Sequence, residues 1–262
     1  MIEGQDTDAG TTAAARVADV LLLFLDGNPT RGVTGIAKEL GLSKAVVHRI
    51  LSSLVSRNLV MTDRRTRQYR LGAAAAALGA RALRELDLRT VALPVLRQLR
   101  DVTGETTTLS LMVDHARVYV DQVESPHEVR MLVEIGRRFP LHAGSSSKVI
   151  LAFSPLDVQQ RVLADDLSSL TPRTITEAER LREELVRVRR DGVSRSRGER
   201  QAGAGSVAAP VLGVDGYAIG AISVCGPLSR FSDEEVAPYV ALVRDAAATI
   251  SQEMGYRAAA GQ

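Results

Sequence analysis

The segment from residue 33 to residue 71 constrains the fold most, because two helix patterns, a glycine turn and a basic hairpin follow one another along it. Thr34 is the expected N-cap of the first helix, and Gly41 supplies the turn after it. Ser43 is expected to cap a second helix that continues to about Arg57. Two helices joined by a glycine turn at this spacing predict a helix-turn-helix.

The second helix has one apolar face and one polar face. Residues at three- and four-residue spacing form the apolar stripe, which predicts burial of that side. The stripe consists of Val47, Ile50, Leu51, Leu54 and Val55. The opposite face carries small, polar or cationic side chains, as a helix lying in a major groove requires. The candidate DNA contacts on and beside that face are Ser43, Lys44, Ala45, His48, Arg49 and Ser52.

A basic hairpin is predicted directly after this helix. Two short strand-like runs, 59–62 and 68–71, are separated by a polar segment that favours a turn. The tip of such a wing would touch phosphates. The candidate contacts at the tip are Arg64, Arg65 and Arg67. The whole pattern predicts a winged helix-turn-helix domain over residues 12–71.

Positive charge is concentrated on this motif. Residues 31–71 carry nine Lys or Arg and two acids, a net charge of +7, whereas the whole chain sums to +2. An isolated run of charge is usually a solvated surface, but coincidence with the motif favours a nucleic-acid partner. With no Trp and 3% aromatic residues, the chain has few platforms on which single-stranded bases could stack. Double-stranded DNA is therefore the expected partner.

Length and composition limit the remaining possibilities. A chain of 262 residues exceeds a typical domain, so two domains are expected. No apolar run approaches the ~18 residues needed to cross a bilayer, and the first residues lack the order of a signal peptide. The single Cys225 excludes an intramolecular disulfide and a cysteine-based zinc cluster. These features predict a soluble, cytoplasmic protein with no metal and no cofactor.

The chain is expected to contain five segments. They are a disordered tail (1–11), the winged helix-turn-helix (12–71), a linker helix (72–87), a larger domain (88–254) and a second disordered tail (255–262). A helix over 12–26, ended by Asn28 and Pro29, is expected to pack against the other helices of the first domain, with a second subunit as a further candidate partner.

The larger domain mixes strand and helix patterns without strict alternation. Alternating runs predict strands at 106–113, 116–124, 129–135, 205–212 and 217–225. Helices are expected at 88–103 with a kink or restart at Pro94, at 155–164 and at 176–191 with a capping box of Thr176 and Glu179. A further helix is expected to open in the block 142–148 and run toward Phe153, and the last one runs from Ser232, capped by Glu235, to Met254. This order predicts an α+β domain around a mainly antiparallel sheet.

Three blocks of the chain resemble the IclR (isocitrate lyase regulator) family of bacterial transcription factors. They are GLSKAVVHRILSSL with the wing ending YRLG, RRFPLHAGSSSKVILA at 137–152, and GSVAAPVLGVDGYAIGAISVCGP at 205–227. The resemblance implies a GAF-like effector-binding domain after the linker helix, a dimer or dimer of dimers, and more often repression than activation. Ser147 departs from the family pattern, which has Gly before the lysine.

A candidate effector site lies in the second block. A Gly/Ser-rich turn that opens a helix presents free backbone N–H groups and a positive dipole end, which can hold a carboxylate. The resemblance adds positions on the facing strands and implies a small organic, possibly aromatic, acid as ligand. The candidate contacts are Gly144, Ser145, Ser146, Ser196, Ser206, Ser223 and Cys225. The alternative is that Ser145 or Ser146 only caps the helix and that Ser223 and Cys225 are small core residues.

One pattern points to a different class of function. Ser145 and Lys148 form S-x-x-K, the nucleophile motif of penicillin-recognising acylases. The motif is short, and its companions S-D-N and K-T-G do not occur. The four histidines are scattered, and no zinc-protease, esterase or P-loop motif occurs. A regulator, most often a repressor and alternatively an activator, is therefore expected in preference to an enzyme.

Overall fold

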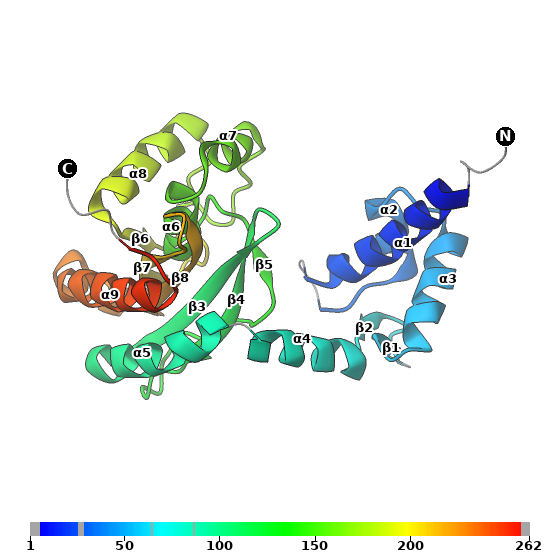
Figure 1. Cartoon of the computed structure of the whole chain (residues 1–262), viewed down its shortest axis with the longest axis horizontal. Coiled ribbons are helices and arrows are strands. Elements are labelled where there is room, and N and C mark those ends of the chain that lie inside the picture. Colours follow the sequence, from blue (N-terminus) through cyan, green and yellow to red (C-terminus); the bar gives the residue numbers. More distant parts are fainter. Residues whose placement is uncertain (1–5, 26–28, 64, 86, 258–262) are drawn as a thin grey trace. The chain divides into compact units, whose positions relative to one another are not determined.

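The computed structural model describes residues 6–25, 29–63, 65–85 and 87–257. The chain divides into two compact units, residues 1–85 and 86–262 (Figure 1). The predicted boundary, inside a linker helix over 72–87, lies close to this division. The single helix there, α4, is Ala73–Glu85 and belongs to the first unit.

The first unit is a helical domain with a small hairpin. Its elements are α1 (Asp6–Leu22), a 3-10 turn (Leu23–Leu25), α2 (Val33–Glu39), α3 (Lys44–Val55), β1 (Val60–Thr62), β2 (Tyr69–Leu71) and α4 (Ala73–Glu85). The apolar stripe predicted for α3 faces the core: its first four members are buried and Val55 is half-buried. It packs with Val20 and Phe24 from the first helical segment and Ile36 from α2. The predicted helix-turn-helix and hairpin are confirmed.

The start of α3 follows the prediction, whereas the start of α2 does not. Ser43 caps α3, and its Oγ accepts the Val46 N–H at 3.3 Å. Gly41 adopts a φ of +63°, the left-handed conformation that the turn requires. The N-cap of α2 is Gly32, without a side-chain cap, so the assignment of Thr34 was wrong. Thr34 lies in the first turn because the helix already begins at Val33.

Helix α1 begins earlier and ends earlier than its sequence pattern suggests. Residues 6–11, expected in the disordered tail, are helical, and residues 1–5 lie outside the described part. The α-helix gives way to the 3-10 turn at Leu23, and the expected end at residues 26–28 lies outside the described residues. Polar and small residues at the start of the helix gave no apolar periodicity, so pattern analysis could not detect that turn.

The second unit is built on a six-stranded sheet. Its helices are α5 (Asp87–Thr103), α6 (Ser145–Ala152), α7 (Leu156–Ala164), α8 (Ala178–Asp191) and α9 (Asp233–Glu253). Its strands are β3 (Thr106–Val113), β4 (Ala116–Val123), β5 (Arg138–Phe139), β6 (Ser194–Arg197), β7 (Ala204–Leu212) and β8 (Ala218–Pro227), and a 3-10 turn covers Leu228–Arg230. The strand order is β5-β4-β3-β8-β7-β6, with every pair antiparallel.

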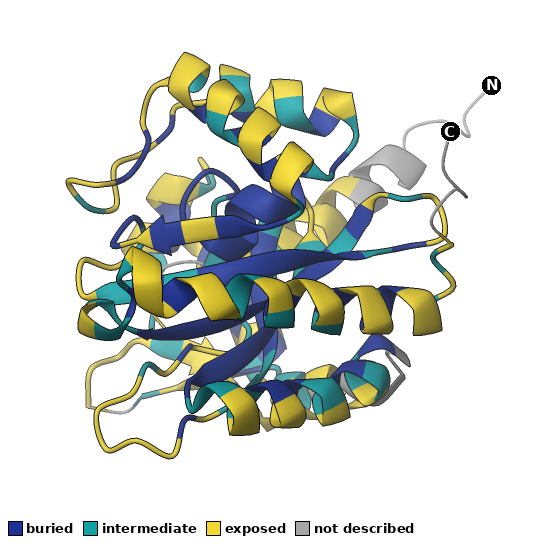
Figure 2. Ribbon diagram, turned by 90° about the vertical axis from the view of Figure 1, so that its left-hand side faces the viewer, coloured by how far each residue is buried: buried dark blue, intermediate teal, exposed yellow. Residues whose placement is uncertain are grey.

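Helices cover both faces of this sheet. Helices α5 and α9 pack against one face, and α6 packs against the other, with α8 and α7 outside it. The strands are largely buried and the covering helices are exposed along their outer sides (Figure 2). The predicted α+β architecture around an antiparallel sheet is confirmed. Pro94 lies within the continuous helix α5, so the helix does not restart there.

The strand predicted at 129–135 is absent. This segment is irregular, and its contacts with the sheet come from side chains: Thr106 Oγ1 donates to the Met131 carbonyl, and the Gln122 amide bonds both backbone groups of Val133. Apolar side chains suggested a strand, but Leu132 is 51% exposed. Alternation alone cannot distinguish a strand from an extended segment without a ladder.

Two short strands and one helix start also differed from expectation. Strands β5 and β6 have two and four residues, too short to give a periodic signal. Helix α8 begins at Ala178 with Glu177 as N-cap and no side-chain cap, so the capping box of Thr176 and Glu179 was wrong. The capping box of Ser232 and Glu235 on α9 is confirmed.

The C-terminal tail, expected from residue 255, is partly ordered. The Tyr256 N–H donates to the Ser251 carbonyl at 2.9 Å, which holds the chain against the end of α9. Residues 258–262 lie outside the described part of the chain.

Candidate DNA-binding surface and effector cavity

The predicted reader face of α3 is accessible. Its candidate residues, Ser43, Lys44, Ala45, His48, Arg49 and Ser52, are all exposed. Ser52 Oγ lies 3.5 Å from His48 Nδ1, one helical turn away. The Lys44 and Arg49 side chains have no ion pair within the described residues, so both cations are available to an anionic partner.

Sequence analysis missed one cation at the end of this helix. Arg57 Nη1 donates to the Ser53 carbonyl at 2.9 Å and lies 3.2 Å from Ser56 Oγ. These contacts satisfy a carbonyl that the helix end leaves without an amide partner. The signal was a basic residue just after the last helical turn, a position that the helix dipole favours.

The hairpin presents its cations on an ordered turn. Asp63 Oδ1 accepts the backbone N–H groups of Arg65 (2.8 Å) and Thr66 (3.2 Å). These hydrogen bonds hold the pKa of the Asp63 carboxyl below its usual value. Arg65 and Arg67 are exposed at this turn, and Arg64 lies outside the described residues. The turn therefore displays guanidinium groups as a phosphate-contacting wing would.

All seven residues predicted for the effector site line one cavity in the second unit. They are Gly144, Ser145, Ser146, Ser196, Ser206, Ser223 and Cys225. Strand register brings three of them into one row, because Ser206 of β7 lies opposite both Ser196 of β6 and Cys225 of β8. Ser223 lies two residues before Cys225 and therefore on the same face of β8.

Helix α6 closes the cavity over this row. The Ser145 and Ser206 hydroxyl oxygens lie 2.7 Å apart, and those of Thr108 and Ser223 also lie 2.7 Å apart. The cavity volume is about 20 Å³, which is room for about one water molecule. A larger ligand must therefore displace lining side chains. Ser223 fits both the prediction of an effector contact and the alternative of a small core residue, because it lines the cavity and also hydrogen-bonds within the sheet.

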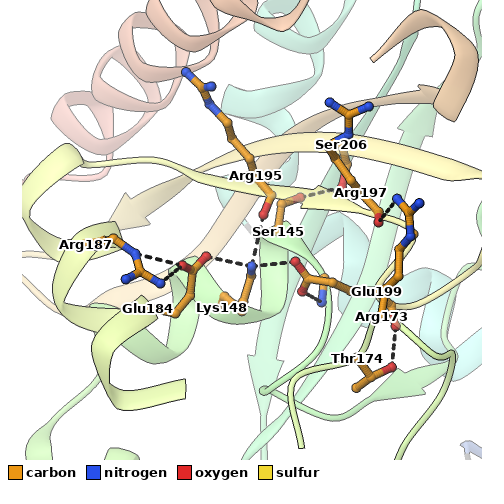
Figure 3. A network of polar contacts seen from close by, with 12 residues as sticks. Ser145, Lys148, Arg173, Thr174, Glu184, Arg187, Arg195, Arg197, Glu199 and Ser206 are labelled. Atoms are coloured by element: carbon orange, nitrogen blue, oxygen red, sulfur yellow. Dashed lines mark hydrogen bonds and ion pairs between the residues drawn. The ribbon is translucent and has the colours of Figure 1, made fainter. Parts of the chain in front are cut away.

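The start of α6 is held by a buried ion network (Figure 3). Gly144 precedes the helix with a φ of +89°, and its N–H donates to Glu199 at 3.1 Å. Glu199 also pairs with Lys148 Nζ at 2.7 Å, and Glu184 of α8 pairs with the same Nζ at 2.8 Å. Lys148 is 1% exposed. The predicted anion-binding turn thus already has one of its N–H groups occupied by a protein carboxylate.

Glu184 connects this network to the surface of α8. Burial raises the pKa of its carboxyl, but attraction to Lys148 and hydrogen bonds from Lys148 and Arg187 outweigh burial, and the net pKa lies below its usual value. The Glu184 carboxyl is therefore charged at neutral pH.

The S-x-x-K pattern does not form a nucleophile. Lys148 would have to be a neutral base beside Ser145, yet its ammonium group is paired with two carboxylates. The Ser145 hydroxyl instead lies against Ser206.

Cys225 is the one thiol of the chain. Burial raises its pKa to about 12, so the thiol is neutral at physiological pH. It therefore contributes a small, uncharged wall to the cavity rather than a reactive thiolate.

Sequence analysis missed the cationic and apolar lining of the cavity. Arg117 and Arg200 supply two guanidinium groups, and Tyr119, Met131 and Val133 supply an apolar wall. The available signal was Arg117 itself, a charged residue at the start of the otherwise apolar run RVYV. Ser147, the departure from the family pattern, is fully buried, and its Oγ accepts from Arg117 Nε at 2.8 Å.

In the described part of the chain, no helix combines the length and the apolar composition of a membrane span. No group of three or more His, Cys, Asp or Glu side chains there is arranged to hold a metal ion.

Comparison with known proteins identifies the family. The IclR helix-turn-helix domain model matches residues 13–64, and the model of the bacterial transcriptional regulator IclR C-terminal domain matches residues 80–252. The chain is 33% identical to the HTH-type transcriptional regulator BhcR of Paracoccus denitrificans (99% of this chain, 93% of BhcR). It is 29% identical to the transcriptional repressor IclR of Escherichia coli (88% of this chain, 85% of that protein).

Among solved structures, the chain is similar to an IclR homolog from Microbacterium hydrocarbonoxydans complexed with 4-hydroxybenzoate. The TM-score is 0.73 at 28% identity, and the match covers 93% of this chain and 99% of the other. These relatives are transcriptional regulators and not enzymes. Both family models and full-length relatives agree with the fold and the reader helix described above, so the chain belongs to the IclR family of bacterial transcriptional regulators.

Proposed function

We propose that this protein is a repressor whose binding to operator DNA is controlled by a small organic acid. The observation that carries the proposal is that one unit has an exposed reader helix and a basic wing, and the other has a small, cation-lined cavity. The similar Escherichia coli protein is a repressor, and the similar Microbacterium protein holds 4-hydroxybenzoate. The proposed targets are catabolic genes near its own gene. A bacterial DNA-binding regulator acts in the cytoplasm, where the chromosome lies.

The proposed working form is a homodimer or a dimer of dimers. Each chain carries one reader helix, α3, and a single helix reads few base pairs. Two copies related by a twofold axis would read an inverted repeat whose half-sites face successive major grooves. The effector would act by changing the stability of the DNA-bound arrangement relative to the free one.

Selection of genomic fragments by the purified full-length protein tests the DNA-binding part. We expect enrichment of an inverted repeat upstream of a catabolic operon, with a footprint over both half-sites. Arg49→Ala should weaken specific binding by about 1–3 kcal/mol if the side chain reaches a base edge. Arg182→Ala, an exposed cation on α8 of the second unit, is the matched control and should bind normally.

A reporter fused to the selected promoter tests the direction of control. Deleting the regulator gene should raise expression, and the inducing acid should raise expression only when the gene is present. Expression that falls on deletion would make the protein an activator. Failure to enrich any sequence above non-specific DNA would contradict the proposed function itself.

A further inference from the structure

Arg117 is a fully buried cation whose hydrogen-bond partners are hydroxyl groups. Its Nε donates to Ser147 Oγ at 2.8 Å and its Nη1 donates to Ser110 Oγ at 3.1 Å. The guanidinium carbon lies 4.1 Å from the ring centre of Tyr119 and 4.8 Å from that of Phe139. Residue 117 is 1% exposed. The side chain is therefore held in one orientation at the wall of the cavity.

No carboxylate in the described part of the chain forms an ion pair with Arg117. Glu199, which precedes Arg200, is neutralised by Lys148. Glu105, which acts electrostatically on Cys225, is neutralised by Arg230.

The cavity therefore carries uncompensated positive charge. Its other cation, Arg200, is half-buried, lies 4.8 Å from the Phe139 ring centre and makes no hydrogen bond or ion pair with a described residue. The two guanidinium groups repel each other, and none of the lining residues of the cavity is acidic.

Such an arrangement is costly for the folded protein alone. Burial lowers the pKa of Arg117, and the charge of Arg200 lowers it further, which shows that this environment disfavours the cation. An arginine nevertheless stays protonated at neutral pH. The two ring faces compensate part of the lost hydration through cation–π attraction, but they carry no net charge. A delocalised anion in the cavity would supply the missing negative charge and pair with the planar guanidinium group.

We propose that Arg117 binds the carboxylate of the effector, and that Ser147 and Ser110 position its guanidinium for this contact. The inference rests on the proposed role of the cavity as the effector site. The ligand class is a monocarboxylate whose body is flat or apolar, because Tyr119, Met131 and Val133 line the cavity beside the cations. Arg200 is the second, less buried cation of the site. The start of α6 has a lesser role, since Glu199 already accepts from Gly144.

Ser147 gives this chain a specific means of orienting Arg117. A glycine at this position, as in the family pattern, has no hydroxyl and leaves the Nε–H without its acceptor. A buried donor without a partner is unfavourable, so Arg117 would then adopt another arrangement. Ser147 is thus a positioning residue that contributes to preference for a carboxylate over an uncharged group.

Thermal unfolding of the full-length protein with matched acids and amides tests the inference. The probes are formate, acetate and 4-hydroxybenzoate against formamide, acetamide and 4-hydroxybenzamide, at constant ionic strength. We expect a saturable rise in the unfolding temperature with at least one acid and none with its amide. Arg117→Met should weaken binding of that acid at least tenfold, as loss of a charged hydrogen bond predicts. It should also unfold no earlier than wild type without ligand, because a buried charge has been removed.

Two further variants make the result decisive. Arg137 also lies over the Phe139 ring, at 5.1 Å, but it is 42% exposed and pairs with Glu134. Arg137→Met should therefore respond to acids like wild type. Ser147→Ala should reduce the ratio of acid to amide affinity without abolishing binding, and an unchanged ratio overturns the positioning role. If Arg117→Met does not fold, that ratio in Ser147→Ala decides the proposal.

Other outcomes separate this inference from the proposed function. Equal responses to acid and amide in wild type, or no response to any of the three acids, overturn the role of Arg117. Carboxylate binding that leaves operator affinity unchanged contradicts the regulatory proposal and keeps the inference. Release from the operator by an uncharged compound keeps the regulatory proposal and contradicts the role of Arg117.

Discussion

Replacing Lys148 by methionine is the sharpest test of how the cavity is held together. The lysine is 1% exposed and pairs with two carboxylates whose side chains are 12% (Glu199) and 19% (Glu184) exposed. Glu184 keeps a second partner, Arg187, at 2.9 Å. Glu199 makes no other ion pair within the described residues. The variant would therefore leave one nearly buried carboxylate without a cation.

The magnitude follows from that count of charges. Removing one partner of a buried pair costs about 3–5 kcal/mol, and partial access of water to Glu199 places the expected value near the lower figure. For a unit of this size, 1 kcal/mol shifts the unfolding temperature by about 2–4 °C. The midpoint of the second unit should fall by roughly 6–12 °C. Differential scanning calorimetry of the full-length protein would resolve this shift from the transition of the first unit.

Two comparisons exclude a general effect of losing a cation. Arg182→Met removes an exposed partner of Glu179 on α8 and should lower the midpoint by less than about 2 °C. Adding Glu199→Gln to Lys148→Met should recover most of the loss, because the stranded charge is gone. If Lys148→Met behaves like Arg182→Met, or if the double variant is no more stable than the single one, the explanation based on an uncompensated charge is wrong.

Three further predictions concern the reader unit and pH. Arg49→Ala should reduce affinity for the operator far more than affinity for random DNA, whereas Arg65→Ala should reduce both and weaken the dependence of affinity on salt concentration. Identical salt dependence of the two variants in DNA titrations would contradict these separate roles. Ser43→Ala should destabilise the first unit by about 1 kcal/mol and Ser43→Gly by only a few tenths, measured by urea unfolding followed by circular dichroism. The folded-state pKa of Glu184 is lowered. Its contribution to the free energy of unfolding is therefore complete above its ordinary pKa of 4.5 and is lost as the pH falls through the folded value. Glu184→Gln should flatten the dependence of stability on pH in that acidic range, and an unchanged dependence would assign the acid sensitivity to other groups.

The sequence by itself determined the features that depend on neighbouring residues. The apolar stripe of α3, its cap at Ser43 and the turn at Gly41 are local, because residues three or four apart on a helix share a face and a cap reaches only its own first turn. The same reasoning identified the Gly/Ser block at the start of α6, but only Gly144 precedes the helix there, because the expected turn residues Ser145, Ser146 and Ser147 already form its first turn. It failed at Thr34 and Thr176, where the residue type suited a cap but the helix began elsewhere.

Only the tertiary structure determined the chemistry of the cavity. Arg117 lies on β4 and Ser147 on α6, thirty residues apart, and the packing of α6 against the sheet brings them to one wall of the cavity. Periodicity shows which face of a strand is buried but carries no information about which strands are neighbours. The irregular segment containing Met131 and Val133 reached the cavity through side-chain hydrogen bonds, which leave no sequence pattern. For this reason the serine hydroxyl groups of the cavity could be predicted from a resemblance, whereas the buried charge of Arg117 beside them could be identified only from the tertiary structure.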